Sequence, residues 1–280
     1  MTIRKAVITA AGRAHRSLPL QTLVDRDGVN RSCLELFVCE AIESGIEQVC
    51  VVVAPGDQPK YHAAAGSLSS RLSFVEQPQQ LGYGHAIHCA RDFVDDEPFL
   101  HMISDHLYLS LSDRRCAKQL IDIAARENCS VSAVQATRES ALPYYGTIGG
   151  RRVHGQARLY EVETVIEKPT PTEAEQTLIV PGLRAGHYLC FFGMHVLTPA
   201  VMDTLGSLLA KSSEKPVTLS DAIAELCRRE RFLAHEILGT RYNMGIKFGL
   251  LYAQIALALD GNDREEVLAH LVEALASRYR

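Results

Sequence analysis

The stretches IRKAVITA (residues 3–10), SCLELFVCEAIESG (residues 32–45) and QVCVVVA (residues 48–54) predict a strand, a helix and a second strand, in that order. The first and third stretches are short, apolar and rich in β-branched residues, which is typical of buried strands. Between them, Ser32 and Glu35 have the spacing of a capping box, so a helix is predicted to begin at Ser32 and to end at Gly45. A unit of this kind favours a parallel sheet with helices on its faces.

The same alternation continues outward from this unit. Further strands are predicted over residues 72–75, 99–103, 130–136 and 232–237, and helices over residues 84–91, 117–126, 218–229, 247–259 and 264–277. Between about Tyr144 and Val196 the pattern becomes short, strand-rich and punctuated by Gly and Pro, which predicts an inserted or flanking sheet along one wall of a cleft. The predicted fold class is α/β, with an open, mainly parallel, Rossmann-like sheet flanked by helices. We expect one domain over residues 1–260, with a strand-rich region over about 140–197, and a C-terminal helix over 261–280.

Composition excludes several classes of function. The formal net charge of -4 comes from 29 basic and 33 acidic residues without a long run of either sign, which argues against nucleic-acid and membrane binding. The 8 cysteines form no CxxC pair and most lie in apolar segments, as reduced thiols do. No targeting segment and no run of ~20 apolar residues is recognised, so we expect a cytoplasmic protein.

The first candidate site follows the first predicted strand, because ligands of parallel sheets bind beyond the carboxyl ends of strands. There Gly12 permits a tight turn whose backbone amides can meet phosphate, and Arg16 supplies positive charge. The segment is neither the dinucleotide fingerprint GxGxxG nor the P-loop GxxxxGK[ST]. An ordinary turn is therefore the alternative interpretation.

Asp105 is the second candidate, because it follows the apolar run Phe99–Ile103 and places a carboxylate at a strand end. Such a carboxylate can hold Mg²⁺ against phosphate oxygens. The nearby histidines suggest zinc as an alternative, but they lack an established ligand spacing with a third partner; they are His85, His88, His101 and His106.

Glu167 and Lys168 form the third candidate, at the end of a β-branched run. A carboxylate can accept hydrogen bonds from paired sugar hydroxyls, and an ammonium acts as a point charge on phosphate. A solvated ion pair at a strand end is the alternative for this pair.

Taken in order, these sites and their neighbours resemble the bacterial UTP-glucose-1-phosphate uridylyltransferases and, more distantly, the other nucleotidyltransferases that activate sugar 1-phosphates. The likeness runs from about Lys5 to Leu259. It is carried by Lys5-Ala-Val-Ile8, Ala11-Gly12, Arg16-Ser-Leu-Pro19, Glu40-Ala-Ile-Glu-Ser-Gly-Ile46, Gln77, Leu81-Gly82-Tyr83-Gly84-His85-Ala86, Asp96-Glu97-Pro98, Asp105, Tyr145-Gly146, Val165-Ile-Glu-Lys-Pro169, Gly193, Thr218-Leu-Ser-Asp-Ala222 and Gly245-Ile-Lys-Phe-Gly249.

The resemblance implies a role for each matching residue. It implies nucleotide binding by Ala11, Gly12 and Arg16, with Gln77 and Gly82 reading the pyrimidine edge. It implies sugar binding by Gly146, Glu167, Lys168 and Gly193, and contact of Lys168 and Lys247 with the sugar phosphate or the α-phosphate. It implies catalysis by Arg16, Asp105, Lys168 and Lys247, with Asp105 carrying Mg²⁺. The implied partners are a nucleoside triphosphate, by default UTP, and a sugar 1-phosphate, by default glucose 1-phosphate.

Three departures from the family pattern bear on activity. Arg13, Ala14 and His15 fill a loop that normally carries small, glycine-rich residues. The family's loop lysine is missing from the shorter connection Leu20–Arg26, where Arg26 or Arg31 could substitute. The second metal-binding aspartate of the family falls at Asn243, whose neutral amide is a poorer Mg²⁺ ligand than a carboxylate.

Three hypotheses follow from these observations. The leading one is an active, Mg²⁺-dependent nucleotidyltransferase. The second is a catalytically impaired nucleotide-sugar-binding or regulatory protein of the same fold, and the third is an NAD(P) oxidoreductase, which the missing glycine fingerprint disfavours. Apolar helical stripes over Leu250–Leu259 and Val267–Leu275 are more often packed on a protein's own core, but they are also compatible with a homo-oligomer.

Overall fold

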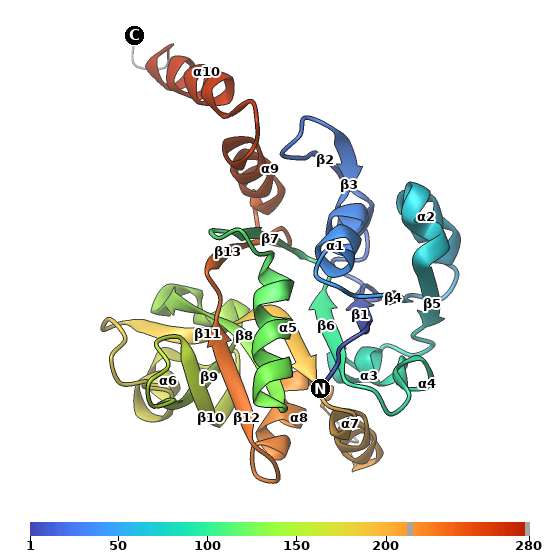
Figure 1. The fold of residues 1–280 in the computed structure, drawn as a ribbon, viewed down its shortest axis with the longest axis vertical. Helices are drawn as coiled ribbons and strands as arrows, with labels where there is room; N and C mark the ends of the chain where they lie inside the picture. Colours follow the sequence, from blue (N-terminus) through green and yellow to red (C-terminus); the bar gives the residue numbers. More distant parts are fainter. Residues whose placement is uncertain (212–214, 278–280) are drawn as a thin grey trace.

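A single large sheet organises the protein (Figure 1). The computed structural model describes residues 1–211 and 215–277, and within them nine strands pair in the order β5-β4-β1-β6-β11-β8-β12-β10-β9. Their bounds are β1 Lys5–Thr9, β4 Gln48–Val53, β5 Leu72–Glu76, β6 Phe99–Ile103, β8 Ser130–Arg138, β9 Gly146–Arg152, β10 Leu159–Glu167, β11 His187–Leu197 and β12 Phe232–Glu236. Two small pairs accompany the sheet: β2 (Thr22–Val24) with β3 (Asn30–Ser32), and β7 (His106–Ser110) with β13 (Gly239–Asn243).

Helices cover the sheet and connect its strands. They are α1 Cys33–Ile42, α2 Gln58–Ala64, α3 Tyr83–His88, α4 Arg91–Val94, α5 Cys116–Glu127, α6 Pro171–Thr177, α7 Ala200–Lys211, α8 Leu219–Leu226, α9 Gly249–Asp260 and α10 Arg264–Ala276, with short 3-10 helices η1 Leu18–Leu20, η2 Gly66–Arg71 and η3 Glu139–Tyr144. The predicted capping box is confirmed, because the Ser32 hydroxyl accepts from Glu35 N and the Glu35 carboxylate accepts from Ser32 N. A second box, Thr218 with Asp221, starts α8 as predicted. No helix within the described ranges is long and apolar enough to cross a membrane.

The α/β fold is confirmed, but the expectation of a mainly parallel, open sheet is wrong. Parallel pairing joins β5, β4, β1 and β6, and again β8 and β12, whereas β11 pairs antiparallel with both β6 and β8. The pairings β8-β12, β12-β10, β10-β9, β9-β11 and β11-β8 also close on themselves as a small barrel. The strand-rich region is thus continuous with the main sheet, because β11 hydrogen-bonds to β6 directly.

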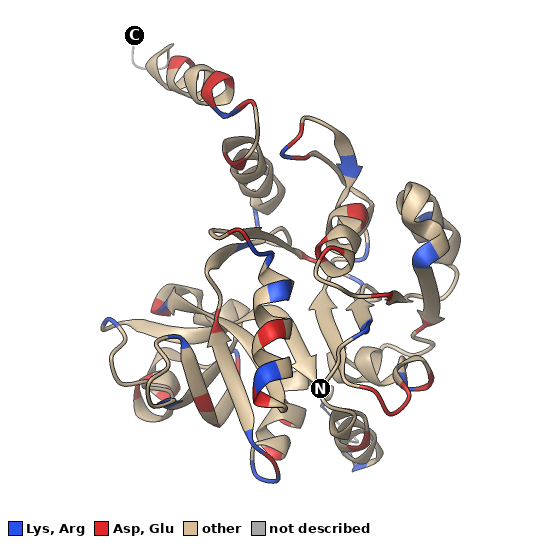
Figure 2. Ribbon diagram, in the orientation of Figure 1, with Lys and Arg blue, Asp and Glu red and all other residues tan. Residues whose placement is uncertain are grey.

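The C-terminal helices differ in how they pack. One face of α9 is buried through Ala253, Ala256 and Leu257, whereas α10 has no buried residue and projects from the body (Figure 1). The Val267–Leu275 stripe was expected to pack on the protein's own core, and in the structure it does not. The predicted extension of this helix to residues 278–280 lies outside the described residues, and a homo-oligomer stays a prediction. Acidic and basic residues are interspersed over the elements (Figure 2).

Candidate active site

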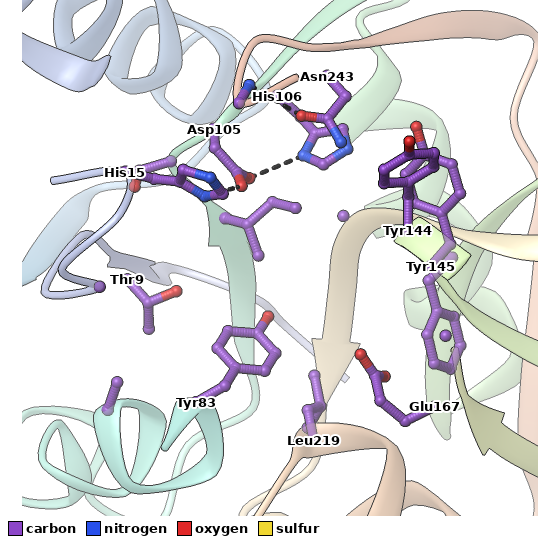
Figure 3. A pocket seen from close by; sticks show the side chains of 18 of the residues that line it. Thr9, His15, Tyr83, Asp105, His106, Tyr144, Tyr145, Glu167, Leu219 and Asn243 are labelled. Carbon is purple, nitrogen blue, oxygen red and sulfur yellow. Dashed lines mark hydrogen bonds and ion pairs between the residues drawn. The ribbon is translucent and has the colours of Figure 1, made fainter. Parts of the chain in front are cut away.

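The loops at the carboxyl ends of β1, β5 and β6 meet the barrel strands around one cavity of about 700 Å³ (Figure 3). The sequence-predicted site residues that line it are Ala11, Gly12, Gln77, Gly82, Asp105, Gly146, Glu167, Lys168, Gly193, Asn243 and Lys247. These residues come from both halves of the chain. The fold therefore brings the nucleotide candidates and the sugar candidates to one site.

Arg16 is the predicted site residue that does not line this cavity. Its guanidinium lies 3.5 Å from Asp57 Oδ2 and is half exposed. The two proposed substitutes for the missing loop lysine are also elsewhere: Arg26 and Arg31 line a different cavity, and Arg31 forms an ion pair with Asp25. The role of Arg16 on the triphosphate stays a prediction that requires the loop to move.

On the nucleotide side, Gln77 is held in one orientation. The residue is buried, with 2% of its surface exposed. Its side-chain amide nitrogen donates to Gly82 O at 3.0 Å and lies 3.1 Å from His85 Nδ1. Gly82 has φ +107°, and a Cβ there would lie 2.7 Å from Pro216 Cβ, so a side chain does not fit. With the amide nitrogen engaged, the carbonyl oxygen of Gln77 is the group left to accept a hydrogen bond from a ligand.

Asp105 lies between β6 and β7, where two imidazoles hold its carboxylate (Figure 3). His15 Nδ1 is 2.9 Å from one oxygen and His106 Nδ1 is 2.8 Å from the other. Burial alone would raise the pKa of Asp105, but the hydrogen bonds from His106 and His15 outweigh it and hold that pKa well below its usual range. The hydrogen bond to Asp105 in turn raises the pKa of His15. Asp105 is therefore a fixed negative charge.

These two histidines were missed as partners of Asp105. The sequence showed His15 only as a bulky residue in the loop, and His106 only as a zinc candidate. No residue pattern connects positions 15 and 105, because the contact forms only when β1 and β6 pair in parallel. The signal that was present is the substitution of loop glycines by a residue able to hydrogen-bond.

Asn243 reaches the same region from β13. In the β7–β13 register it lies opposite His106, and its Oδ1 accepts a hydrogen bond from Gly245 N at 2.9 Å. Residues 1–211 and 215–277 contain no group of three or more His, Cys, Asp and Glu side chains placed to hold a metal ion. Each carboxylate oxygen of Asp105 keeps a further lone pair besides the one that faces an imidazole. Asp105 and the Asn243 amide thus fit Mg²⁺ as a partial oxygen set, of the kind that phosphates and water complete.

The opposite wall of the cavity is formed by the end of β10 and by α8. Glu167 Oε2 accepts a hydrogen bond from the Ser220 hydroxyl at 2.5 Å, which leaves Oε1 for a ligand. A Cβ on Gly146 would lie 2.8 Å from Glu167 Oε2 and 2.6 Å from the Phe191 ring. A side chain at position 146 would therefore displace the glutamate.

Lys168 and Lys247 are the cavity's lysines, and each lies at an irregular point of the backbone. Lys168 itself has φ +50°, and Phe248, which follows Lys247, has φ +63°. Left-handed conformations cost a residue with a side chain about 1 kcal/mol or more, and in folded proteins they cluster at functional sites. For Lys168 this observation motivates the functional interpretation over that of a solvated surface charge, whereas for Lys247 the left-handed residue is its neighbour Phe248.

Comparison with known proteins adds an independent line of argument. A family model for nucleotidyl transferases matches residues 5–240. The UTP-glucose-1-phosphate uridylyltransferase of Streptococcus pneumoniae is 30% identical over 285 residues, covering 92% of this chain and 91% of that protein. A uridylyltransferase of the same description from Bacillus subtilis is 27% identical over 300 residues, covering 98% and 96% of the two chains.

Solved structures are similar in fold. A UDP-glucose pyrophosphorylase complexed with UDP-glucose superposes with a TM-score of 0.73 at 22% identity, covering 91% of this chain and 98% of that one. A UTP-bound UGPase from Acinetobacter baumannii gives a TM-score of 0.73 at 22% identity, covering 97% and 99%. At such identities these structures are a guide to the fold alone.

Proposed function

Since the chain belongs to the nucleotidyl transferase family, we propose that it transfers the uridylyl group of UTP to glucose 1-phosphate and releases pyrophosphate. The enzyme class follows from the family, whereas the substrate pair is the proposal. The observation that carries it is the meeting of Gln77, Asp105, Glu167 and Lys168 around one cavity. Relatives that span most of the chain are named for the same pair of substrates.

The orientation of Gln77 supports a uracil base. Its free carbonyl oxygen is an acceptor, and uracil presents an N3–H donor, whereas N3 of cytosine is itself an acceptor. A buried acceptor that meets another acceptor loses a hydrogen bond at a cost of about 1–3 kcal/mol. An oxygen of Gln77 that faces N3 of the base, rather than the N4 amino group of cytosine, would favour UTP over CTP, and it would not separate uracil from thymine.

Glu167 supports a sugar as the acceptor. Its free Oε1 can accept hydrogen bonds from sugar hydroxyls, while the Ser220 hydroxyl fixes Oε2. We assign the phosphate on the same sugar to the neighbouring Lys168, which lines the same cavity. A carboxylate next to an ammonium thus matches a molecule with hydroxyls at one end and phosphate at the other.

In the reaction we propose, an oxygen of the sugar phosphate attacks the α-phosphorus of UTP in line. The new phosphorus–oxygen bond forms as the bond to the β-phosphate breaks, and pyrophosphate leaves with the bonding electrons. Lys168 and Lys247 orient the phosphates and offset the charge that develops, so catalysis rests on positioning and electrostatics. Mg²⁺, when bound by Asp105 with the Asn243 amide beside it, would neutralise phosphate charge.

The test is a matrix of nucleoside triphosphates against sugar 1-phosphates, read by pyrophosphate release. The expected result is the highest kcat/KM for UTP with glucose 1-phosphate. A higher value for another pair would overturn the substrate assignment. Ligand-dependent melting without pyrophosphate release from any pair would instead support the impaired, nucleotide-sugar-binding alternative, which Asn243 and the missing loop lysine motivate.

A further inference from the structure

Arg241 is a buried cation that, among the described residues, has no carboxylate partner. The residue is 8% exposed, and its guanidinium donates to Gln135 Oε1 at 3.2 Å and to Thr137 Oγ1 at 3.0 Å. In the part of the chain that the structure describes, no Asp or Glu forms an ion pair with it, and its Nε has no hydrogen-bond partner. Burial lowers the pKa of Arg241, as expected where no acid compensates, yet arginine keeps its charge in proteins.

The guanidinium lies directly behind the cavity wall. It stacks 3.9 Å from the centroid of the Tyr145 ring, and Tyr145 lines the cavity. The ring of His106 is 5.9 Å from the same tyrosine ring. Among the described residues, His106 Nε2 and Arg241 Nε are the buried side-chain polar atoms that have no partner. Both therefore flank one wall residue.

Strand register explains this arrangement. In the β7–β13 pair Arg241 lies opposite Tyr108, and Asn243 lies opposite His106. Alternate residues of a strand share a face, so Arg241 projects to the same face as Asn243, which lines the cavity. The strand thus carries one residue into the cavity and the next one on that face just behind its wall.

A buried charge without a counter-charge is costly, and an apolar side chain of similar size would cost less. We therefore expect a buried arginine that is retained to meet a counter-charge in the working state of the protein. Tyr145 adjoins Lys168, whose backbone N–H donates to Tyr145 O at 3.2 Å, and the proposed function assigns Lys168 to phosphate. We propose that the phosphate chain of the bound substrate is the counter-charge of Arg241, and that Arg241 is a positioning residue acting through Tyr145. The inference rests on the proposed function for the ligand's identity, and on the geometry of Arg241 for the charge.

Two contributions follow from this placement. The guanidinium holds the Tyr145 ring through a cation–π contact, which fixes the wall that the ligand meets. Its charge also acts across a region screened from water, where an electrostatic interaction is stronger than at the surface. Since Arg241 lies behind the ring, it raises affinity for anionic ligands without touching the reacting atoms.

The experiment compares Arg241→Met, Arg241→Lys and a control, Arg151→Met. The methionine removes the charge at similar length, while the lysine keeps the charge and loses the fork to Gln135 and Thr137. Arg151 is an exposed β9 arginine that pairs with Glu161 and does not line the cavity. Calorimetric titration with UDP-glucose and with inorganic pyrophosphate gives Kd, and melting of the free protein reports stability.

We expect Arg241→Met to weaken binding of both ligands by about tenfold or more, with Tm of the free protein unchanged or raised. Arg241→Lys should bind within about threefold of wild type, and Arg151→Met should be indistinguishable from it. Equal affinity in wild type and Arg241→Met, including binding by neither, overturns the inference. So does a loss of affinity in both Arg241 variants with a Tm lowered by several degrees, because that shows a structural role.

The two proposals fail separately. If UDP-glucose is not bound and UTP is not turned over with glucose 1-phosphate, the substrate assignment fails. A dependence of pyrophosphate binding on Arg241 in that same protein would still support the inference, because pyrophosphate contains neither base nor sugar.

Discussion

The Nδ1 atom of His15 lies 2.9 Å from Oδ2 of Asp105, so a side chain of the loop after β1 holds the carboxylate at the end of β6. The contact joins the loop expected to bind the nucleotide to the residue expected to hold the metal. A metal ion that binds this oxygen must either share the oxygen with the imidazole or displace the imidazole. His15 therefore links the position of the loop to metal binding, and the first two predictions concern this pair.

Asp105→Ala should abolish Mg²⁺-dependent turnover, because it removes the strand-end carboxylate that fits the metal. The variant also leaves His15 and His106 without their shared acceptor, so its fold is checked by circular dichroism and melting. Pyrophosphate release at saturating Mg²⁺ is the measurement. Asp203→Ala, which removes an exposed partner of Arg91, is the control. A near wild-type rate for Asp105→Ala would show that Asp105 does not bind the metal.

His15→Ala should lower the Mg²⁺ concentration that gives half the maximal rate by several-fold, because a competing partner leaves the carboxylate. The raised pKa of His15 gives this effect a pH dependence. Below that pKa the imidazolium holds Asp105 most strongly, so the wild-type Mg²⁺ requirement should rise as pH falls from 8 to 6. Mg²⁺ titrations at both pH values test this. If wild type and variant show the same pH dependence, His15 does not compete with the metal.

Lys168→Ala and Lys247→Ala should each lower kcat/KM by roughly 10²-fold, the scale for loss of one preorganised charge-stabilising group. Lys168→Gly separates charge from backbone conformation, because glycine adopts φ +50° freely. It should lose the same activity while the free energy of unfolding changes by less than about 1 kcal/mol. Lys118→Ala, on an exposed face of α5, is the control. A change in activity below about threefold would identify that lysine as a surface residue.

Asn243→Asp should tighten Mg²⁺ binding and raise turnover at low metal. The carboxylate is nearly isosteric with the amide, and it can accept the same hydrogen bond from Gly245 N. Arg26 and Arg31 line another cavity, so neither is positioned to pair with the new charge. Rate is measured against Mg²⁺ concentration for both proteins. Superimposable curves would show that position 243 does not contact the metal.

The buried imidazole of His195 should make the fold sensitive to acid. Burial lowers the pKa of His195 to about 3, whereas an unfolded histidine titrates near 6.5. Between these two pKa values the unfolded state binds a proton at this histidine and the folded state does not. The free energy of unfolding is therefore unaffected above pH ~6.5 and falls by about 1.4 kcal/mol per pH unit as the pH decreases towards 3. His195→Gln should show a shallower fall in the free energy of unfolding between pH 6.5 and 4.5. An unchanged slope would contradict this.

Local elements could be predicted from the sequence because their causes are local. The capping box of Ser32 and Glu35 and the apolar runs of β1, β4 and β6 use neighbouring residues only. The resemblance then assigned site roles to residues along the chain. All of these site residues except Arg16 line the cavity. The order of these residues along the chain carries the resemblance, even though no single motif is decisive.

What only the tertiary structure decided are pairings between distant residues. Whether β11 runs parallel or antiparallel to β6 depends on a connection through the barrel, so the mixed sheet was not predicted. The hold of His15 on Asp105 requires β1 and β6 in register. The burial of Arg241 behind Tyr145 requires β13 to pair with β7. A sequence pattern reports the chemistry each residue carries, whereas its partner, and hence its charge balance, is set by contacts between segments far apart in the chain.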